Sequence, residues 1–417
     1  MSKLIKKLSK FIFVLSAVMA TALVAMTFYS KYALPDQFYV SKGQSLHIDS
    51  KYCVEPVSTG AARGNTSQAS ASENASYRME LRLFGLIPVK QVQVNVVDQS
   101  EVVVCGTPFG IKMFTDGVLV IGASDVMCDG SAVNPAKNAG IKVGDVIVKM
   151  NGARVYTNED VGKIVSGSAG ESVSVTYKRN GQTLYTDLSP ALSDEDKGYK
   201  AGIWVRDSTA GIGTMTFYDP AAGVFGGLGH AICDVDTGKL MPLSSGDIVG
   251  VTITGVKKGE AGTPGELKGG FVESQHMGTL CANGETGVYG TIENAGPIQG
   301  KAMPVAFKQE IKEGKAKVIT TLDGQTAQEY EVMIEKVNYN DGTPTKNMIV
   351  KITDPQLLSK AGGIVQGMSG SPLVQDGKLI GAVTHVFVND PTKGYAIFAE
   401  NMLSSAKNVE NSVSNAA

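Results

Sequence analysis

A serine stands between glycines near the end of the chain, in the stretch GIVQGMSGSPLVQDGKLIGAV at residues 363–383. A hydroxyl nucleophile has to stand clear of its neighbours, with backbone N–H groups nearby to stabilise a developing oxyanion. The glycines around Ser369 permit the backbone angles that such a loop requires. The sequence therefore predicts Ser369 as a nucleophile and the backbone N–H groups of Gly367 and Ser369 as its oxyanion hole. The alternatives are a glycine turn that only precedes a hairpin, and Ser371 as the reactive hydroxyl.

A serine nucleophile needs a general base, and the chain contains four histidines. His230 lies in GVFGGLGHAICDVDTG, a glycine-rich stretch with a small residue directly after the histidine. This setting favours His230 as the base that takes the proton of Ser369. His385, on the strand predicted after the serine, is the main rival. His276 has no shaped loop around it, and His47 lies far upstream.

The acid that would orient the imidazole is harder to assign. Asp354 precedes the serine in TDPQLLSKAGG, and this pattern is also that of a helix N-cap followed by proline and ended by glycine. The two roles are compatible if a single carboxylate oxygen caps the helix. Asp234 and Asp236 lie nearer to His230 in sequence, but residues along one strand rarely fold back onto a ring. The residues alone therefore favour the capping role for Asp354.

Composition limits the class of protein. Glycine contributes 49 of 417 residues without a collagen-like period, which indicates many tight turns and a mainly β fold. The net charge of −2 gives no reason to expect a nucleic-acid partner. The five cysteines show no CxxC spacing, so we expect free, buried thiols rather than disulfides or zinc. The proposed chemistry needs no metal and no organic cofactor.

The N-terminus has the features of a membrane segment. Lysines at positions 3, 6, 7 and 10 precede FIFVLSAVMATALVAMTFYS, which carries no charge and is long enough to cross a bilayer. Residues 1–30 are therefore expected to be a basic tip and a spanning anchor, or alternatively a cleaved signal peptide. Either interpretation places residues 31–417 outside the cytoplasm. Residues 31–99 are expected to be a stem with a flexible linker at 57–76 and one alternating strand, VKQVQVNVV.

Residues 100–192 resemble a PDZ domain of the type attached to extracytoplasmic proteases. The resemblance rests on PFGIK, on NAGIKVGDVIVKMNG and on a helix around TNEDVGKIV. It implies an α+β domain that binds a peptide or a protein C-terminus. We expect the backbone N–H groups of Phe109, Gly110 and Ile111 to hold the terminal carboxylate, with the next strand edge pairing with the peptide. The alternative is a groove that is closed by a segment of the chain itself.

Residues 196–417 are rich in short strands separated by turn signals, which favours a β-barrel or a double barrel. The order of loop, serine, proline, strand, Asp-Gly turn and strand resembles the nucleophile region of chymotrypsin-like serine proteases. The predicted architecture is therefore mainly β, with a transmembrane helix, a PDZ domain and a chymotrypsin-like double β-barrel peptidase domain.

The chain also closely resembles the stage IV sporulation protein B peptidases of endospore-forming bacteria. The resemblance is carried by GIWVRDSTAGIGTMTFYDP at 202–220, FGGLGHAICDVDTG at 225–238 and GGIVQGMSGSPLVQDGKLIGAVTHVFVNDP at 362–391. It implies a catalytic triad of His230, Asp354 and Ser369, and so raises Asp354 above Asp234.

The resemblance also implies a biological role. Family members cross into the space between the forespore and mother-cell membranes, cleave themselves near the N-terminus and cut a membrane-embedded regulator. That cut relieves inhibition of an intramembrane metalloprotease, which processes a late sigma factor. Two other functions remain open at this point: an inactive PDZ scaffold, and a general extracytoplasmic quality-control protease.

Overall fold

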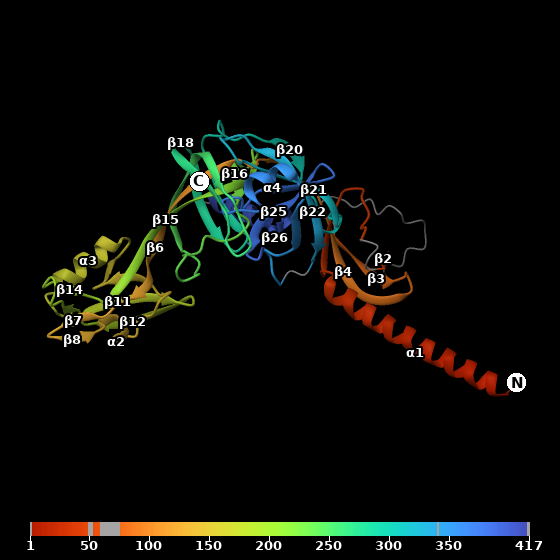
Figure 1. Cartoon of the computed structure of the whole chain (residues 1–417), viewed down its shortest axis with the longest axis horizontal. Helices are drawn as coiled ribbons and strands as arrows, with labels where there is room; N and C mark the ends of the chain where they lie inside the picture. The colour runs from red at the N-terminus through yellow and green to blue at the C-terminus, as the bar shows by residue number, and fades with distance from the viewer. Residues whose placement is uncertain (1, 49–52, 59–75, 340–341, 415–417) are drawn as a thin grey trace.

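The computed structural model describes residues 2–48, 53–58, 76–339 and 342–414 (Figure 1). Most of the linker predicted at 57–76 lies outside these residues. The described part is mainly β, as predicted. From one end to the other it consists of a projecting helix, a small sheet, two barrels and a PDZ domain (Figure 1).

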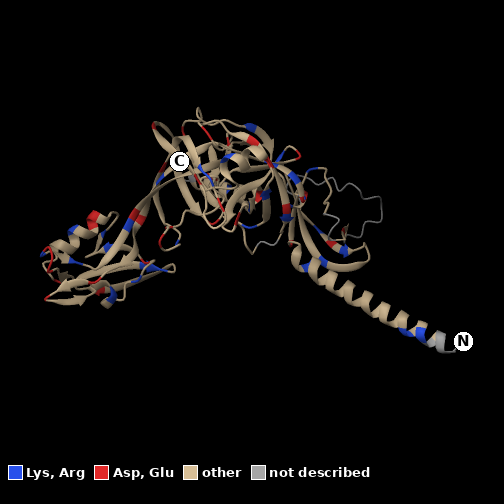
Figure 2. Cartoon of the chain, in the orientation of Figure 1, with Lys and Arg blue, Asp and Glu red and all other residues tan. Residues whose placement is uncertain are grey.

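Helix α1 (Ser2–Ala33) projects away from the body of the molecule (Figure 1). Its segment Lys7–Ala33 has a mean hydropathy of 2.3 and is long and apolar enough to cross a membrane. Charged residues on α1 are confined to lysines near its two ends, so its middle is uncharged (Figure 2). The helix ends against strand β4 (Ile87–Val97), where Lys90 donates hydrogen bonds to the Leu34 carbonyl at 2.6 Å and to Asp36 at 2.7 Å.

The predicted stem is a folded sheet in the order β1-β4-β3-β2. Its strands are β1 (Gln37–Ser41), β2 (Val54–Ser58), β3 (Ser76–Leu83) and β4 (Ile87–Val97). Alternate side chains of β4, the strand predicted at VKQVQVNVV, are buried. The buried face joins the same hydrophobic core as the second barrel, and Gln309 donates a hydrogen bond to the Tyr39 carbonyl. The sheet is therefore packed on the second barrel.

The first barrel is a closed circuit of strand pairings. β6 (Pro108–Ala123) pairs with β17 (Leu243–Lys257), β17 with β18 (Glu266–Gly284), and β18 with β19 (Gly287–Ile292). β19 pairs with β16 (Val224–Gly227), β16 with β15 (Ile203–Asp219), and β15 returns to β6. β5 (Glu101–Val104) and β20 (Lys301–Pro304) extend the sheet beyond β15.

The second barrel is also closed, in the order β21-β22-β23-β26-β25-β24. The strands are β21 (Gly314–Thr320), β22 (Gln328–Val337), β23 (Met348–Ile352), β24 (Pro372–Gln375), β25 (Lys378–Phe387) and β26 (Asp390–Phe398). A short 3-10 turn (Lys308–Glu310) precedes the barrel, α4 (Pro355–Ala361) follows β23, and α5 (Ala399–Ser414) ends the described chain. The predicted Asp376-Gly377 turn joins β24 to β25, with φ of 51° and 77°. Together with the first barrel, it gives the predicted double β-barrel.

The PDZ domain is inserted between two strands of the first barrel. Its elements are β7 (Val126–Cys128), β8 (Ser131–Val133), α2 (Pro135–Asn138), β9 (Val146–Met150), β10 (Ala153–Arg154), α3 (Asn158–Gly167), β11 (Val173–Arg179), β12 (Gln182–Leu188), β13 (Ala191–Leu192) and β14 (Tyr199–Lys200). β6 leads from the barrel into this domain and β15 returns to the barrel (Figure 1). The predicted boundary at residue 100 is therefore wrong, because residues 101–104 and 108–115 pair with barrel strands.

All five cysteines are free thiols in this structure. The prediction that they are buried is wrong for two of them, because Cys233 and Cys281 are exposed. Cys105, in contrast, is buried in the first barrel.

Candidate active site

The loop that carries Ser369 can be built only with glycines at two positions. Gly367 and Gly370 have φ of 93° and 91°, a region that residues with a β-carbon rarely adopt. A β-carbon at Gly370 would also lie 2.0 Å from the Thr214 carbonyl oxygen and 2.5 Å from the Leu228 nitrogen. The glycine therefore lets the serine loop contact the backbone that leads to His230.

The backbone N–H groups of this loop divide into two kinds. Those of Met368, Gly370 and Ser371 donate to the carbonyls of Val365, Val383 and Met368 at 3.1, 2.8 and 2.9 Å. Those of Gly367 and Ser369 donate to no group within the described residues. The two N–H groups expected from the sequence to form an oxyanion hole are thus the ones left available for a ligand.

Strand β15 holds the loop from the other barrel. The Thr214 hydroxyl donates to the Gly367 carbonyl at 2.8 Å, and the Thr216 hydroxyl donates to the Gly370 carbonyl at 2.7 Å. The Thr214 backbone N–H donates to the Ser369 carbonyl at 3.0 Å. These three bonds turn the loop's carbonyls toward β15 and restrain the loop between the barrels.

The rival hydroxyl, that of Ser371, is not available for chemistry. The residue is 0% exposed, and its hydroxyl donates to the Thr320 hydroxyl at 3.0 Å. Ser369 is half-buried, and its hydroxyl donates to the Thr384 carbonyl at 2.9 Å. Ser369 is therefore the hydroxyl of this loop that a substrate can reach.

His230 follows β16 and lies next to the segment that accepts the serine hydroxyl. A β-carbon at Gly229 would be 3.0 Å from the Thr384 side chain, and the His230 ring lies 4.8 Å from the His385 ring between centroids. The Nδ1 atom of His230 is 2.8 Å from the Ala231 carbonyl, so Nδ1 carries the proton and Nε2 is left as the basic nitrogen. The structure thus brings His230, its rival His385 and the Ser369 loop together, although no hydrogen bond joins the Ser369 hydroxyl to either ring among the described contacts.

Both histidines are biased toward the neutral form. Burial lowers the pKa of His230, against a smaller opposing effect of the Ala231 hydrogen bond. Burial of the His385 ring, followed by the charges of His230 and Lys346, lowers its pKa to about 4. A neutral imidazole can accept a proton, so this electrostatic setting suits a general base.

The structure places Asp354 at the N-cap of α4. Its Oδ1 accepts the N–H groups of Gln356 and Leu357 at 2.8 and 3.2 Å, and its Oδ2 accepts the Glu331 N–H at 3.2 Å. Pro355 occupies the first turn and Gly362 ends the helix with φ of 75°, as the pattern predicts. No described contact joins Asp354 to His230; the Ala231 carbonyl occupies the Nδ1 side of the ring.

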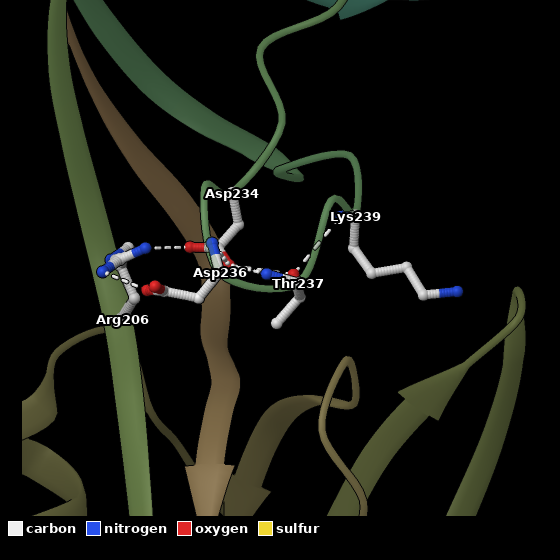
Figure 3. Close-up of polar contacts among 5 residues, drawn as sticks. All are labelled: Arg206, Asp234, Asp236, Thr237 and Lys239. Atoms are coloured by element: carbon white, nitrogen blue, oxygen red, sulfur yellow. Dashed lines mark hydrogen bonds and ion pairs between the residues drawn. The ribbon is translucent and has the colours of Figure 1, made fainter. Parts of the chain in front are cut away.

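The other candidate acids are engaged elsewhere. Asp234 and Asp236 both form ion pairs with Arg206 of β15, in the loop that follows His230 (Figure 3). His276 lies 3.5 Å from Glu293, and His47 is exposed in the N-terminal segment.

The predicted PDZ carboxylate loop is wrong. Phe109, Gly110 and Ile111 lie within β6, are buried, and pair with β15 on one side and β17 on the other. Their backbone groups belong to the first barrel, and the Phe109 ring packs against Phe225 with a centroid distance of 5.8 Å. They cannot receive a peptide terminus.

A groove lies elsewhere in the PDZ domain. It is lined by α3 on one side and by residues 199–205 on the other. In this groove the first residues of β15 pair with β6 through one edge, from Ile203↔Ala123 to Arg206↔Leu119. The motif YKAGIWV at residues 199–205 could have indicated this groove from the sequence, because it has the same glycine-plus-apolar pattern as PFGIK and leads into β15.

Comparison with protein families gives two matches. Residues 197–403 match the family model for the SpoIVB peptidase S55, and residues 111–189 match that for a PDZ domain. The double barrel and these matches define the chain as a serine peptidase that carries a PDZ domain. The match to the SpoIVB peptidase S55 model agrees with the family resemblance predicted from the sequence.

Curated relatives match over short stretches. A putative zinc metalloprotease of Clostridium acetobutylicum is 40% identical over 73 residues, which is 18% of this chain and 22% of the relative. The zinc metalloprotease RasP of Shouchella clausii is 33% identical over 81 residues, 18% of this chain and 19% of the relative. The chain thus spans about a fifth of the length of these relatives.

Among solved structures, the HtrA-type protease AlgW with a decapeptide has 16% identity and a TM-score of 0.30, with 52% of this chain and 56% of that chain covered. The Rv3671c protease of M. tuberculosis in its active form has 12% identity and a TM-score of 0.26, with 48% and 74% covered.

Proposed function

We propose that this peptidase cleaves peptide bonds with Ser369 as nucleophile and His230 as general base. The observation that carries the proposal is the glycine-shaped loop, whose Gly367 and Ser369 N–H groups have no partner among the described residues. The Ser369 hydroxyl of this loop donates to the Thr384 carbonyl, and Thr384 contacts the residue that precedes His230. In the reaction Nε2 of His230 takes the proton of the Ser369 hydroxyl as its oxygen attacks the scissile carbonyl. The carbonyl oxygen becomes an oxyanion that the two N–H groups stabilise. The imidazolium then protonates the leaving amine, and water releases the acyl group.

For this step the Ser369 hydroxyl has to turn from the Thr384 carbonyl toward His230. Hydrogen bonds between catalytic groups are often long or misaligned before substrate binds, so this rotation is compatible with the mechanism. In this proposal the Ala231 carbonyl, which accepts the Nδ1 proton, orients the imidazole, and Asp354 caps α4.

We further propose that the enzyme acts in sporulation signalling outside the cytoplasm, in the space between the forespore and mother-cell membranes. The match to the SpoIVB peptidase model and the long apolar segment Lys7–Ala33 of helix α1 support this localisation. The proposed substrates are the chain itself, near its N-terminus, and a membrane-embedded regulator of an intramembrane metalloprotease that activates a late sigma factor. The PDZ groove between α3 and residues 199–205 would bind a peptide or a protein C-terminus.

The catalytic proposal is tested with the full chain in detergent and its S369A variant. We expect a fluorophosphonate to label the wild type at Ser369 and to leave S369A unlabelled. New N-termini, mapped by mass spectrometry, are expected only in the wild type. An unlabelled wild type would support the alternative of an inactive PDZ scaffold, and indiscriminate cleavage of unfolded proteins would support a quality-control protease.

The groove can be tested through the chain's single tryptophan, Trp204, which lines it and is 64% exposed. A peptide that adds to the free edge of β15 would cover the indole and change its fluorescence. A C-terminally amidated copy of the same peptide is the control for carboxylate recognition.

A further inference from the structure

Arg206 lies on β15 at the junction between the PDZ domain and the first barrel. At this point β15 still pairs with the PDZ end of β6, with Arg206 opposite Leu119. The guanidinium leaves the strand and forms ion pairs with Asp234 and with Asp236, the latter at 2.9 Å (Figure 3). One planar cation thus binds two carboxylates of the loop that follows His230.

Asp234 is the centre of that loop. Its side chain is 0% exposed, and its Oδ1 accepts the N–H groups of Asp236 and Thr237 at 3.2 and 2.8 Å and the Thr237 hydroxyl at 2.9 Å. Burial alone would raise the pKa of Asp234, but the hydrogen bonds from Thr237 and Arg206 outweigh it and the net shift is downward. A buried carboxylate that loses its cation is strongly destabilised, so Arg206 is needed to keep Asp234 in place.

The loop is closed at its base as well as at its tip. The Asp234 N–H donates to the Lys239 carbonyl at 2.8 Å, and the backbones of Cys233 and Leu240 pair in an isolated antiparallel β-bridge. At the base, Asn283 accepts the Ile232 N–H at 2.8 Å and donates to the Ile232 carbonyl at 2.9 Å. The backbone between His230 and Asp234 is therefore held at two points. One is Asn283 in the first barrel, and the other is Arg206 on β15, where this strand joins the barrel to the PDZ domain.

The loop also contacts the PDZ domain. A β-carbon at Gly144 would lie 3.3 Å from Cε of Lys239, so the lysine chain packs over this glycine. Strand β15 itself lines the PDZ groove with Trp204 and Val205, binds the histidine loop with Arg206, and holds the serine loop with Thr214. The groove and both catalytic segments are thus joined by one continuous strand.

We propose that Arg206 is a positioning residue for the peptidase reaction. By binding Asp234, Arg206 fixes the position of the His230 imidazole and links the histidine loop to β15, the strand that lines the PDZ groove. This inference rests on the proposed roles of His230 and Ser369. Arg206 does not touch the reacting atoms; it acts through the loop at residues 231–236. Small displacements of a catalytic group are enough to slow a reaction strongly.

The test compares rates of fluorophosphonate labelling at Ser369 in the full chain. R206Q removes both ion pairs and is expected to label roughly tenfold more slowly than the wild type. R206K keeps the charge without the two-pronged geometry, so its rate should fall between the two. R154Q is the matched control, because Arg154 pairs with Asp116 in the PDZ domain without touching the histidine loop; it should label like the wild type.

Two further measurements separate positioning from a general loss of structure. Alkylation of the exposed Cys233, located by peptide mass spectrometry, should be faster in R206Q and unchanged in R154Q. Because Arg206 acts through Asp234, the double variant R206Q/D234N should label no more slowly than the slower of its two single variants.

Labelling of R206Q at the wild-type rate would overturn the proposal, whatever happens at Cys233. Slower labelling with unchanged Cys233 alkylation, or effects of R206Q and D234N that simply multiply, would also overturn it, because Arg206 would then act by another route. A wild type that fails to label at all would instead refute the proposed catalytic roles.

Discussion

The hydroxyl of Thr214 donates a hydrogen bond to the carbonyl oxygen of Gly367, at 2.8 Å, and so joins one barrel to the nucleophile loop of the other. The two residues come from distant parts of the sequence, and the bond fixes the direction of the peptide that precedes Met368. The Gly367 N–H, on the preceding peptide, has no partner among the described residues. A single side chain thus helps to shape the proposed oxyanion hole.

Thr214→Val should slow labelling of Ser369 by about tenfold, because the Gly367 carbonyl loses its partner and the loop can turn. The free energy of unfolding should fall by only about 1–3 kcal/mol, the usual effect of leaving one buried acceptor unpaired. Thr254→Val is the control, since the exposed Thr254 hydroxyl donates at 3.3 Å to the Lys268 carbonyl within the same barrel. Equal labelling rates in the two variants would contradict this role of Thr214.

Ser371→Ala should show the opposite pattern. The buried Ser371 hydroxyl is a partner of Thr320, so its loss should lower the free energy of unfolding by about 1–3 kcal/mol. Labelling by the fluorophosphonate should continue at Ser369. Chemical denaturation and peptide mapping of the labelled site check the two expectations. Loss of labelling in Ser371→Ala would show that Ser371, and not Ser369, is the nucleophile.

Asp354→Asn separates the cap from catalysis. Asparagine also caps helices, but the change removes the charge that accepts three backbone N–H groups, so stability should fall by about 1 kcal/mol. Under conditions in which the variant is folded, its labelling rate should stay close to that of the wild type. A large loss of rate with intact stability would show instead that Asp354 orients His230 in the reacting enzyme, as the family resemblance implies.

The lowered pKa of His385 predicts that the protein loses stability in acid. His385 has a folded pKa of about 4, lowered by burial and by the charges of His230 and Lys346, against about 6.5 for an unfolded histidine. Between these values the unfolded chain binds more protons than the native one, so stability is complete above about pH 6.5 and falls as the pH drops toward 4. H385Q should make this dependence shallower, as measured by denaturation midpoints at pH 7.5 and pH 5; an unchanged slope would contradict it.

The reaction itself should follow His230. Burial lowers the pKa of His230, so the base stays neutral to lower pH than an ordinary histidine. The rate of Ser369 labelling should therefore fall in acid with a midpoint below about 6.5. Rates measured from pH 4.5 to 8 check this, and a midpoint above 6.5 would contradict it.

Features set by local chemistry were readable from the sequence alone. The turns at Asn151-Gly152, Asn180-Gly181 and Asp376-Gly377 adopt positive φ, because these residue types tolerate that region. The Asp354-Pro355 cap, the long apolar helix and the alternating strand β4 follow from similarly short-range rules. The glycine pattern around Ser369 also indicated its loop, since no other residue fits at Gly370.

Which segments meet was decided only by the tertiary structure. PFGIK has the pattern of a PDZ loop, yet long-range pairing with β15 and β17 places Phe109–Ile111 inside the first barrel. The same pairing moves the groove to residues 199–205 and makes β15 common to the groove and both catalytic loops. Both oxygens of Asp354 are bound by backbone N–H groups, which a local pattern could not reveal. Strand partners and the directions of buried side chains depend on residues far apart in the chain, so they follow from the packed barrels rather than from any one motif.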